Sequence, residues 1–121
     1  MKNKFVYKIL KYQEWFNNKN FYFGSKKDIN DGFIHLSTYD QVQDTYKIHY
    51  YAQKNLIIVY FYIKDLNDKL KWENSRDNQL FPHYYGKIKK SLMVNFLELK
   101  TRFDNSHEFP KDFFTGEFFH K

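Results

Sequence analysis

The sequence lacks cysteine altogether and holds only four glycines and two prolines in 121 residues. Without cysteine there can be no disulfide, no thiolate metal site and no cysteine nucleophile, and the chain suits a reducing compartment. Any catalysis would have to use histidine, carboxylate, hydroxyl or lysine side chains. No linker rich in glycine, proline or serine divides the chain, so we expect a single domain over residues 1–121.

Long apolar runs are absent as well. The sequence has no stretch of about 18 apolar residues that could span a membrane. Its first residues, Met1 to Phe5, lead into a strand pattern without the apolar region of a signal peptide. We therefore expect a cytoplasmic protein with no membrane partner.

Apolar and aromatic residues are plentiful. They make up 42% and 22% of the sequence, which is far more buriable surface than a disordered chain carries. A chain of this length is large enough for one core but not for two. We expect that core over about residues 5–99, followed by a phenylalanine-rich tail, residues 100–121, that could wrap back over it.

The net charge is +6 and the isoelectric point is near 9.3. Clustered basic residues favour nucleic acid, because they displace counterions from phosphates. Nearly all of this charge is lysine, however, with Arg76 and Arg102 as the only arginines. The chain is equally rich in asparagine, isoleucine, phenylalanine and tyrosine, which share AT-rich codons with lysine. Two interpretations therefore stay open: general solubility, and a real anionic partner such as nucleic acid.

Apolar periodicity divides the chain into strands and helices. Strands are expected where apolar residues alternate or form short β-branched runs, and helices where they recur at spacings of three and four. The predicted strands cover residues 5–10, 21–23, 33–36, 56–63, 70–73 and 92–99, and the predicted helices cover 12–17 and 39–52. The pattern predicts an α+β fold with a small mixed or antiparallel sheet and two or so helices.

The two helices have recognisable features. Trp15 and Phe16 should turn inward from the first helix. Thr38 and Gln41 fit a capping box at the start of the second helix, where each side chain would satisfy a free backbone N–H. The second helix is therefore the best defined of the chain.

The remaining segments are predicted from their turn chemistry and apolar content. Residues 24–32 are rich in turn-forming residues and are expected to be a loop. The β-branched and aromatic run 56–63 should be the central strand, covered on both faces. Pro82 interrupts the apolar stretch 80–86, which makes that stretch an unlikely interior strand.

Polar residues with chemical potential crowd into two segments, 32–38 and 72–86. In the first, His35 would share a strand face with Ser37, and an imidazole can donate, accept or titrate near neutral pH. The alternative is a half-buried histidine bonded to the backbone.

The second segment begins with Trp72, Glu73 and Arg76, which lie within five residues. Arginine can bind carboxylate or phosphate in a bidentate fork, and glutamate can act as a base or accept from a ribose hydroxyl. The alternative is a surface ion pair between Glu73 and Arg76 that contributes little.

His83 follows Pro82 and precedes Tyr84, Tyr85 and Gly86. Such a rigid aromatic loop could stack against a planar ligand ring. It could equally be a packed plug.

Metal binding has less support from the sequence. The oxygen-rich turn at residues 28–31 lacks the later acidic ligand of a calcium loop and is better explained as a turn. His35, His49, His83 and Glu73 have no close spacing typical of a metal site, so we predict none. Two further histidines lie in the tail and are expected in solvent, namely His107 and His120.

The two polar segments also carry a family resemblance. The residues concerned are Trp15, Asp28, Asp31 to Thr38, Gln41, Thr45, Trp72, Glu73, Ser75 and Phe81 to Gly86. With them the chain closely resembles the small bacterial family called domain of unknown function 952, from about Phe5 to Leu99. The resemblance implies a fold grouped with the ADP-ribosyltransferase-like folds.

A second likeness points in the same direction. Phe33 to Ser37, followed by a helix, is similar to the Val-His-Leu-Ser segment of RNA 2'-phosphotransferases, which share that fold and use NAD. This likeness implies that His35 touches the substrate or NAD, and that Glu73 could stand in for the catalytic glutamate of ADP-ribosyltransferases.

Together these arguments predict a cleft for a nucleotide-like ligand, with NAD as a possible cofactor. His35, Glu73 and His83 are the candidate catalytic residues. The candidate ligand-binding residues are Ser37, Trp72, Arg76 and Tyr85. Two alternatives remain: a non-catalytic module for a small ligand, a peptide or single-stranded nucleic acid, and a metal-dependent hydrolase.

Overall fold

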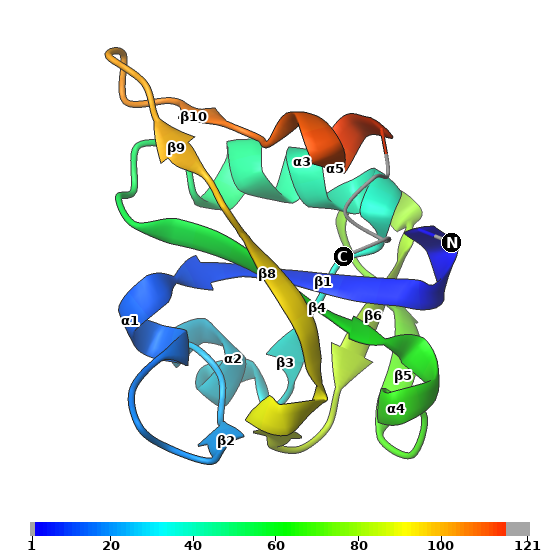
Figure 1. Ribbon diagram of the computed structural model, residues 1–121. Coiled ribbons are helices and arrows are strands. Elements are labelled where there is room, and N and C mark those ends of the chain that lie inside the picture. Colours follow the sequence, from blue (N-terminus) through cyan, green and yellow to red (C-terminus); the bar gives the residue numbers. More distant parts are fainter. Residues whose placement is uncertain (1, 116–121) are drawn as a thin grey trace.

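The structure is a computed structural model that describes residues 2–115 (Figure 1). Its central sheet has the order β1-β4-β8, and both pairs of neighbouring strands are antiparallel. The strands are β1 (Phe5–Lys11), β4 (Leu56–Tyr62) and β8 (Met93–Glu98). The prediction that the apolar run after residue 55 forms the central strand is confirmed.

Helix α3 spans Tyr39–His49 and covers one face of this sheet (Figure 1). The backbone N–H of Thr38 donates to Oε1 of Gln41 at 3.0 Å, as expected for a capping box. The helix ends before the predicted Ala52, because Ala52 has a φ of 68° and so cannot continue it.

The two faces of the central sheet carry separate cores, because successive side chains of a strand point to opposite sides. On one face Tyr7 packs with Tyr46 of α3. On the other face Val59 packs with Ile34 and Tyr84, which belong to a second sheet. The central sheet is thus covered on both sides, by a helix and by another sheet (Figure 1).

The tail lies beside α3 on the helical face (Figure 1). Phe109 is buried, and Phe113 is fully buried, in the same cluster as Tyr46. For residues 100–115 the predicted return of the tail to the core is therefore confirmed. Its elements are β9 (Lys100–Thr101), β10 (His107–Glu108) and α5 (Lys111–Thr115).

One histidine of the tail was predicted wrongly. His107 was expected in solvent, but it is 3% exposed, and its Nδ1 lies 2.8 Å from the hydroxyl of Tyr46. Phe109, two residues further along, is buried in the core and anchors the strand that carries His107 beside α3. His120 lies outside the described residues.

The second sheet has the order β3-β6-β5 and is antiparallel throughout. It consists of β3 (Ile34–His35), β6 (Leu80–Tyr84) and β5 (Leu70–Asn74). Just beyond β3, Ser37 and Tyr7 exchange two backbone hydrogen bonds of 2.8 Å. This bridge ties the second sheet to the edge of the first.

The expectation that residues 80–86 would not form an interior strand is wrong, because β6 is the middle strand of this sheet. The C=O of Pro82 accepts the N–H of Leu36 at 3.1 Å and so points toward the β3 side. In a strand the N and C=O of one residue point to the same side. The missing N–H of Pro82 therefore faces β3, which is only two residues long, and the ladder to β5 loses no donor.

The predicted loop 24–32 is also wrong, since it contains the helix α2 (Lys26–Asp31). Ser25 caps this helix: its Oγ accepts the N–H of Asp28 at 3.2 Å, and its own N–H donates to Asp28 Oδ2 at 2.9 Å. Gly32 ends the helix in the left-handed conformation, with φ 85°. The turn residues of this segment are the two caps of a short helix.

Short elements complete the described chain. Trp15 is buried as predicted, but Phe16 is 41% exposed, because the first helix is a single turn whose other side faces solvent. The short elements are the 3-10 turns η1 (Lys2–Lys4), η2 (Arg76–Asn78) and η3 (Lys90–Leu92), the helices α1 (Tyr12–Trp15) and α4 (Ile63–Leu66), and the paired strands β2 (Phe21–Tyr22) and β7 (Ile88–Lys89). Among residues 2–115, no helix has the length and apolar character needed to cross a membrane.

Candidate functional site

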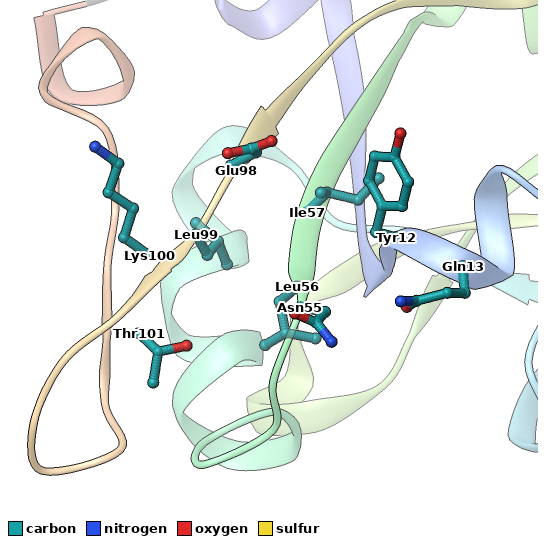
Figure 2. A pocket seen from close by; sticks show the side chains of 9 residues that line it. All are labelled: Tyr12, Gln13, Asn55, Leu56, Ile57, Glu98, Leu99, Lys100 and Thr101. Carbon is teal, nitrogen blue, oxygen red and sulfur yellow. The ribbon is translucent and has the colours of Figure 1, made fainter.

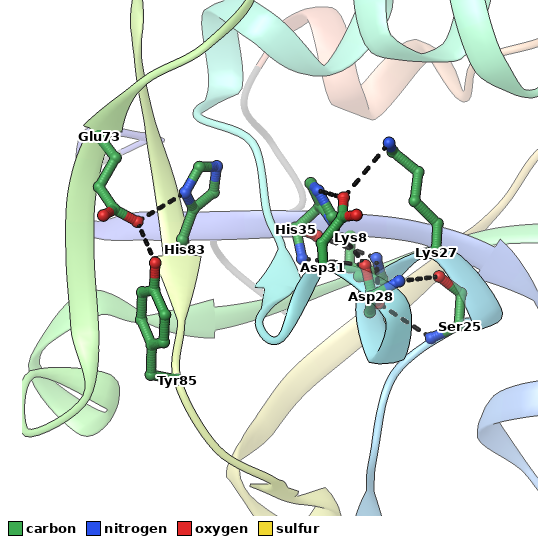
Figure 3. A network of polar contacts seen from close by, with 9 residues as sticks. All are labelled: Lys8, Ser25, Lys27, Asp28, Asp31, His35, Glu73, His83 and Tyr85. Carbon is green, nitrogen blue, oxygen red and sulfur yellow. Dashed lines mark hydrogen bonds and ion pairs between the residues drawn. The ribbon is translucent and has the colours of Figure 1, made fainter.

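Two histidines from the two polar segments lie side by side on the second sheet. His35 of β3 is the register partner of His83 of β6, and their ring centroids are 5.6 Å apart. Alternation along the strands places Glu73 and Tyr85 on the same face as His83. The segments that the sequence singled out thus converge on one face of one sheet (Figure 3).

His83, Glu73 and Tyr85 form the first of two polar clusters, which we call the glutamate cluster. Nδ1 of His83 lies 2.9 Å from Oε1 of Glu73, and the hydroxyl of Tyr85 donates to the same oxygen at 2.7 Å. These hydrogen bonds, from Tyr85 first and then from His83, hold the pKa of Glu73 below its usual value. The bond to Glu73 in turn raises the pKa of the Tyr85 hydroxyl.

Two polar atoms of the glutamate cluster have no hydrogen-bond partner among the described residues. His83 is 5% exposed, while the Glu73 side chain is 40% exposed. Neither Nε2 of His83 nor Oε2 of Glu73 is hydrogen-bonded to a residue of the described chain. With Nδ1 donating to a carboxylate, the neutral His83 ring presents Nε2 as an acceptor. The cluster can therefore accept a hydrogen bond, or a proton, from a ligand.

His35 belongs to the second cluster, which we call the aspartate cluster. Its Nδ1 lies 2.6 Å from Oδ1 of Asp28 and its Nε2 lies 3.0 Å from Oδ2 of Asp31. Its backbone N–H also donates to Asp28 Oδ1, at 3.1 Å. Both ring nitrogens are thus engaged by carboxylates, so this histidine holds β3 against α2 (Figure 3).

Asp28 is paired with a lysine beneath His35. Nζ of Lys8 lies 2.9 Å from Asp28 Oδ2 and donates to the carbonyl of His35 at 2.9 Å. Both side chains are almost fully buried, 4% and 2% exposed. Burial alone would raise the pKa of Asp28, but the hydrogen bond from His35 and the charge of Lys8 hold it well below its usual range. Asp28 is therefore an ionised carboxylate inside the protein.

Phe33 joins the two clusters. Its ring stacks on His83, with centroids 4.1 Å apart and planes 23° apart, and lies 4.6 Å from the ring of His35. The centroid of the Tyr85 ring lies 5.3 Å from that of Phe33. Four rings thus form an aromatic surface with carboxylates at both edges, suited to a ligand with both flat and polar parts.

Ser37 and Arg76 meet through a residue of α3 that the site prediction did not include. Thr45 Oγ1 lies 3.1 Å from Ser37 Oγ, and Nη2 of Arg76 donates to it, also at 3.1 Å. The guanidinium carbon lies 5.0 Å from the centre of the Phe81 ring. Among the described residues Arg76 does not pair with Glu73, so the surface ion pair considered from the sequence is absent.

Positive charge surrounds this face. The pKa of His49 on α3 is lowered by partial burial first, and then by the charges of Arg76, Lys27 and His35. Nζ of Lys71 lies 4.8 Å from the centre of the Tyr85 ring. Arg76, Lys27 and Lys71 come from three separate elements, η2, α2 and β5, and positive charge arranged in this way favours an anionic ligand.

Trp72 does not join the site. It pairs with Pro82 in the register of β5 and β6, so its side chain leaves the opposite face of the sheet from Glu73. Its side chain is 42% exposed there.

The sequence prediction missed Lys8, Asp28 and Phe33. Lys8 is distant along the chain from Asp28, and Phe33 is distant from His83. One signal could have found Asp28: the Ser25-x-x-Asp28 spacing, which is a capping box of the kind recognised at Thr38.

Two cavities lie outside the glutamate cluster. One, of about 320 Å³, opens where α1, β4 and β8 approach the tail and contains none of the predicted site residues (Figure 2). The other, of about 140 Å³, borders Asp28, Phe33 and Gly86 beside the site. Among residues 2–115, no three His, Asp or Glu side chains are placed to hold a metal ion.

The fold and this face define an α+β domain with several antiparallel sheets, few helices and a polar, aromatic surface on the smaller of its two three-stranded sheets. The family described as "Protein of unknown function (DUF952)" matches residues 9–96, and the chain belongs to this family.

Solved structures show the same fold. The crystal structure of protein CC0527 from Caulobacter crescentus is 35% identical, with a TM-score of 0.80, over 86% of this chain and 93% of that one. The solution NMR structure of CC0527 is 34% identical, with a TM-score of 0.74, over 85% and 90% of the two chains. No curated protein matches the sequence.

Proposed function

We propose that the face formed by Phe33, Glu73, His83 and Tyr85 binds a nucleotide-like ligand, with NAD or ADP-ribose as the leading candidates. The observation that carries this proposal is that two acceptors of this face, Nε2 of His83 and Oε2 of Glu73, have no partner among the described residues and lie beside an aromatic surface. A ligand hydroxyl such as that of a ribose would supply the missing donors. Arg76, together with the surrounding lysines, would meet its phosphates.

An ADP-ribosyltransferase-like fold is part of this proposal. The likeness of Phe33 to Ser37 to the phosphotransferase segment supports it. One departure limits it: β1 carries Lys8 in a buried ion pair with Asp28, whereas ADP-ribosyltransferases usually place His-Gly-Thr on this strand, against the nicotinamide ribose. Any NAD chemistry here would rest on the glutamate cluster.

If the protein is an enzyme, the reaction we propose is cleavage of the bond between nicotinamide and ribose. Glu73, held as a carboxylate, would orient a ribose hydroxyl or the acceptor, and Tyr85 would hold the cofactor. An acceptor hydroxyl would form the new bond to the ribose carbon as nicotinamide leaves with the bonding electrons. His83 would take the proton of that hydroxyl at Nε2 while Glu73 fixes its ring through Nδ1. His35, with both ring nitrogens on carboxylates, would position β3 rather than touch the reacting atoms.

The second candidate is a non-catalytic binding module on the same face. One observation favours it: Oε1 of Glu73 already accepts from both His83 and Tyr85, so only one oxygen of the carboxylate remains for chemistry. Such a module would take a small ligand, a peptide or single-stranded nucleic acid, and would bind without turnover.

Ligand-observed NMR and thermal unfolding with NAD, ADP-ribose and other nucleotides test the proposal. A ligand at 100 times its dissociation constant stabilises a protein by about 2.7 kcal/mol, which is easily seen. We expect NAD or ADP-ribose to stabilise the wild type, and His83→Ala and Glu73→Gln to abolish the effect. Lys54→Gln, in the exposed turn between α3 and β4, is the control and should bind normally.

The outcomes separate the two candidates. Release of nicotinamide that stops in Glu73→Gln supports the enzyme. Binding without release supports the module. If no nucleotide binds, or if His83→Ala binds as well as the wild type, the proposal is wrong.

A single domain and a cytoplasmic location belong to the same proposal. A single domain predicts one cooperative unfolding transition for the whole chain. Fractionation of cells that express the protein tests the location.

A further inference from the structure

A second basic surface lies on the paired strands β2 and β7, apart from the glutamate cluster. Residues 17–25 and 84–92 contain lysines but neither aspartate nor glutamate. We call this surface the lysine ribbon, and its lysines are Lys19, Lys87, Lys89 and Lys90. They supply four positive charges in a chain whose net charge is +6.

The charge of the lysine ribbon is not neutralised within the described part of the protein. None of its lysines forms an ion pair with a carboxylate of residues 2–115, in contrast to Lys8 with Asp28 and Lys27 with Asp31. Nζ of Lys90 instead donates to Oδ1 of Asn17 at 2.6 Å. Lys19, Lys87 and Lys89 are exposed and Lys90 is partly buried, so the ribbon is a patch of positive charge that no carboxylate of the described residues neutralises.

Aromatic rings lie among these lysines. Tyr22 and Ile88 of the two strands are buried, so their neighbours Phe21 and Lys89 point outward as a register pair. Phe23 is 53% exposed, and its ring centroid lies 6.5 Å from that of Phe21. The outer face thus presents two rings between cations.

One lysine is in contact with both rings. Nζ of Lys87 lies 4.3 Å from the centre of the Phe21 ring and 5.9 Å from that of Phe23. An exposed cation held over one partly buried ring and one exposed ring places a phosphate-binding group and a stacking surface within one nucleotide of each other.

We propose that the lysine ribbon binds single-stranded nucleic acid, with phosphates on its lysines and bases stacked on Phe21 and Phe23. Single strands combine closely spaced negative charge with unpaired bases, and this surface offers the complement of both. A duplex could use the lysines but not the rings.

The ribbon adjoins the candidate site. Phe23 and Gly86 line the same 140 Å³ cavity as Phe33, whose ring stacks on His83. A single strand of nucleic acid bound along the ribbon would therefore reach the glutamate cluster. The proposal nevertheless rests on the ribbon alone and holds whether or not NAD binds.

Fluorescence anisotropy of the full chain with labelled oligo(U) and oligo(dT) of about 12 nucleotides tests the proposal. Each phosphate neutralised on a single strand adds about −0.7 to the slope of log affinity against log salt, so four lysines predict a slope of roughly −3. Lys87→Gln/Lys89→Gln should weaken binding and flatten the slope by roughly 1.4. Lys47→Gln/Lys54→Gln removes the same charge from another surface and should leave the affinity and the salt slope unchanged.

Phe23→Ala tests the stacking. Because this ring is 53% exposed, its removal should leave the fold intact, which the thermal midpoint will show. We expect oligo(U) to bind at least about fivefold more weakly, and duplex of the same length to bind as before. An equal loss of affinity for oligo(U) and for the duplex would contradict stacking and overturn the proposal.

Other outcomes would also overturn it. One is no binding of either oligonucleotide at low salt. Another is an equal loss of affinity in the two double-lysine variants, which would mean that only net charge matters. A third is binding to phosphatidylserine vesicles, but not to oligonucleotides, that depends on Lys87 and Lys89. His83→Ala should keep oligonucleotide affinity, so failure of the nucleotide site and failure of the ribbon are distinguishable.

Discussion

The aspartate cluster and the glutamate cluster each contain a histidine next to a carboxylate, but they differ in how fully their atoms are partnered. Both oxygens of Asp28 are occupied: Oδ1 by His35, and Oδ2 by Lys8 and the N–H of Ser25. Glu73 receives two hydrogen bonds on one oxygen and is 40% exposed. A buried carboxylate and a histidine ring whose polar atoms are all engaged hold the fold together, whereas a cluster with spare acceptors can bind something else.

The largest expected effect breaks the aspartate cluster. Lys8→Met and Asp28→Asn should each lower the free energy of unfolding by about 3–5 kcal/mol, because each leaves its buried partner without a counter-charge. The double variant should lose less than the sum of the two, because the charges depart together. Urea unfolding measures all three.

Lys27→Met is the matched control for Lys8→Met. Lys27 also pairs with an aspartate, at 3.4 Å, but its side chain is 64% exposed. An exposed pair contributes little, so the change should stay within about 0.5 kcal/mol. If Lys8→Met is equally mild, the aspartate cluster does not stabilise the fold as described.

The next effect is a dependence of the free energy of unfolding on pH, which should be larger for the aspartate cluster than for the glutamate cluster. The pKa of Asp28 is held well below its ordinary 3.8 by His35 and Lys8, against the opposing effect of burial. In acid the unfolded chain therefore takes up this proton before the folded protein does. The stabilisation from Asp28 is complete above about pH 5, and it is lost as the pH falls below roughly 4 toward the folded pKa.

The measurement is urea unfolding at several acidic pH values. Asp28 alone should contribute a loss of up to about 1.4 kcal/mol per pH unit. Asp28→Asn should remove that part of the slope and leave the part due to other carboxylates. An unchanged slope would mean that Asp28 has the same affinity for protons in both states.

The smallest effect concerns the glutamate cluster. Glu73→Gln should change the free energy of unfolding far less than Lys8→Met or Asp28→Asn, because this carboxylate is partly in water. It should also bring the pKa of Tyr85 down toward its usual value, since the bond to Glu73 raises it. NMR titration of labelled tyrosine follows this directly. Glu98→Gln, on β8, is the control and should leave the pKa of Tyr85 unchanged.

Strong local patterns predicted much of the fold. The run in β4 and the capping of α3 are signals within a few residues, and both elements formed as expected. The convergence of His35 and His83 depends instead on the register of β3 against β6, which Pro82 obscured. A proline excludes a strand from the interior only if its missing N–H faces a partner, and that direction is a property of the assembled sheet.

The candidate site shows the same limit. His35, Glu73 and His83 could be chosen by residue type and neighbourhood. That His35 is fully occupied could not be predicted, because its partners Asp28 and Asp31 come from a helix that was taken for a loop. The difference between a partnered and an open histidine depends on contacts across elements, which a single sequence does not display.

The family match ends at residue 96, but the core does not. Phe113 of the tail is fully buried, its ring stacks on Tyr39 at 4.7 Å, and its carbonyl accepts the Tyr39 hydroxyl. The tail therefore docks on α3 much as a separate peptide ligand would. A chain cut at the hairpin between β9 and β10 would have an empty docking groove on α3, and a synthetic peptide of the tail added in trans would restore the core, making this domain a natural candidate for fragment complementation.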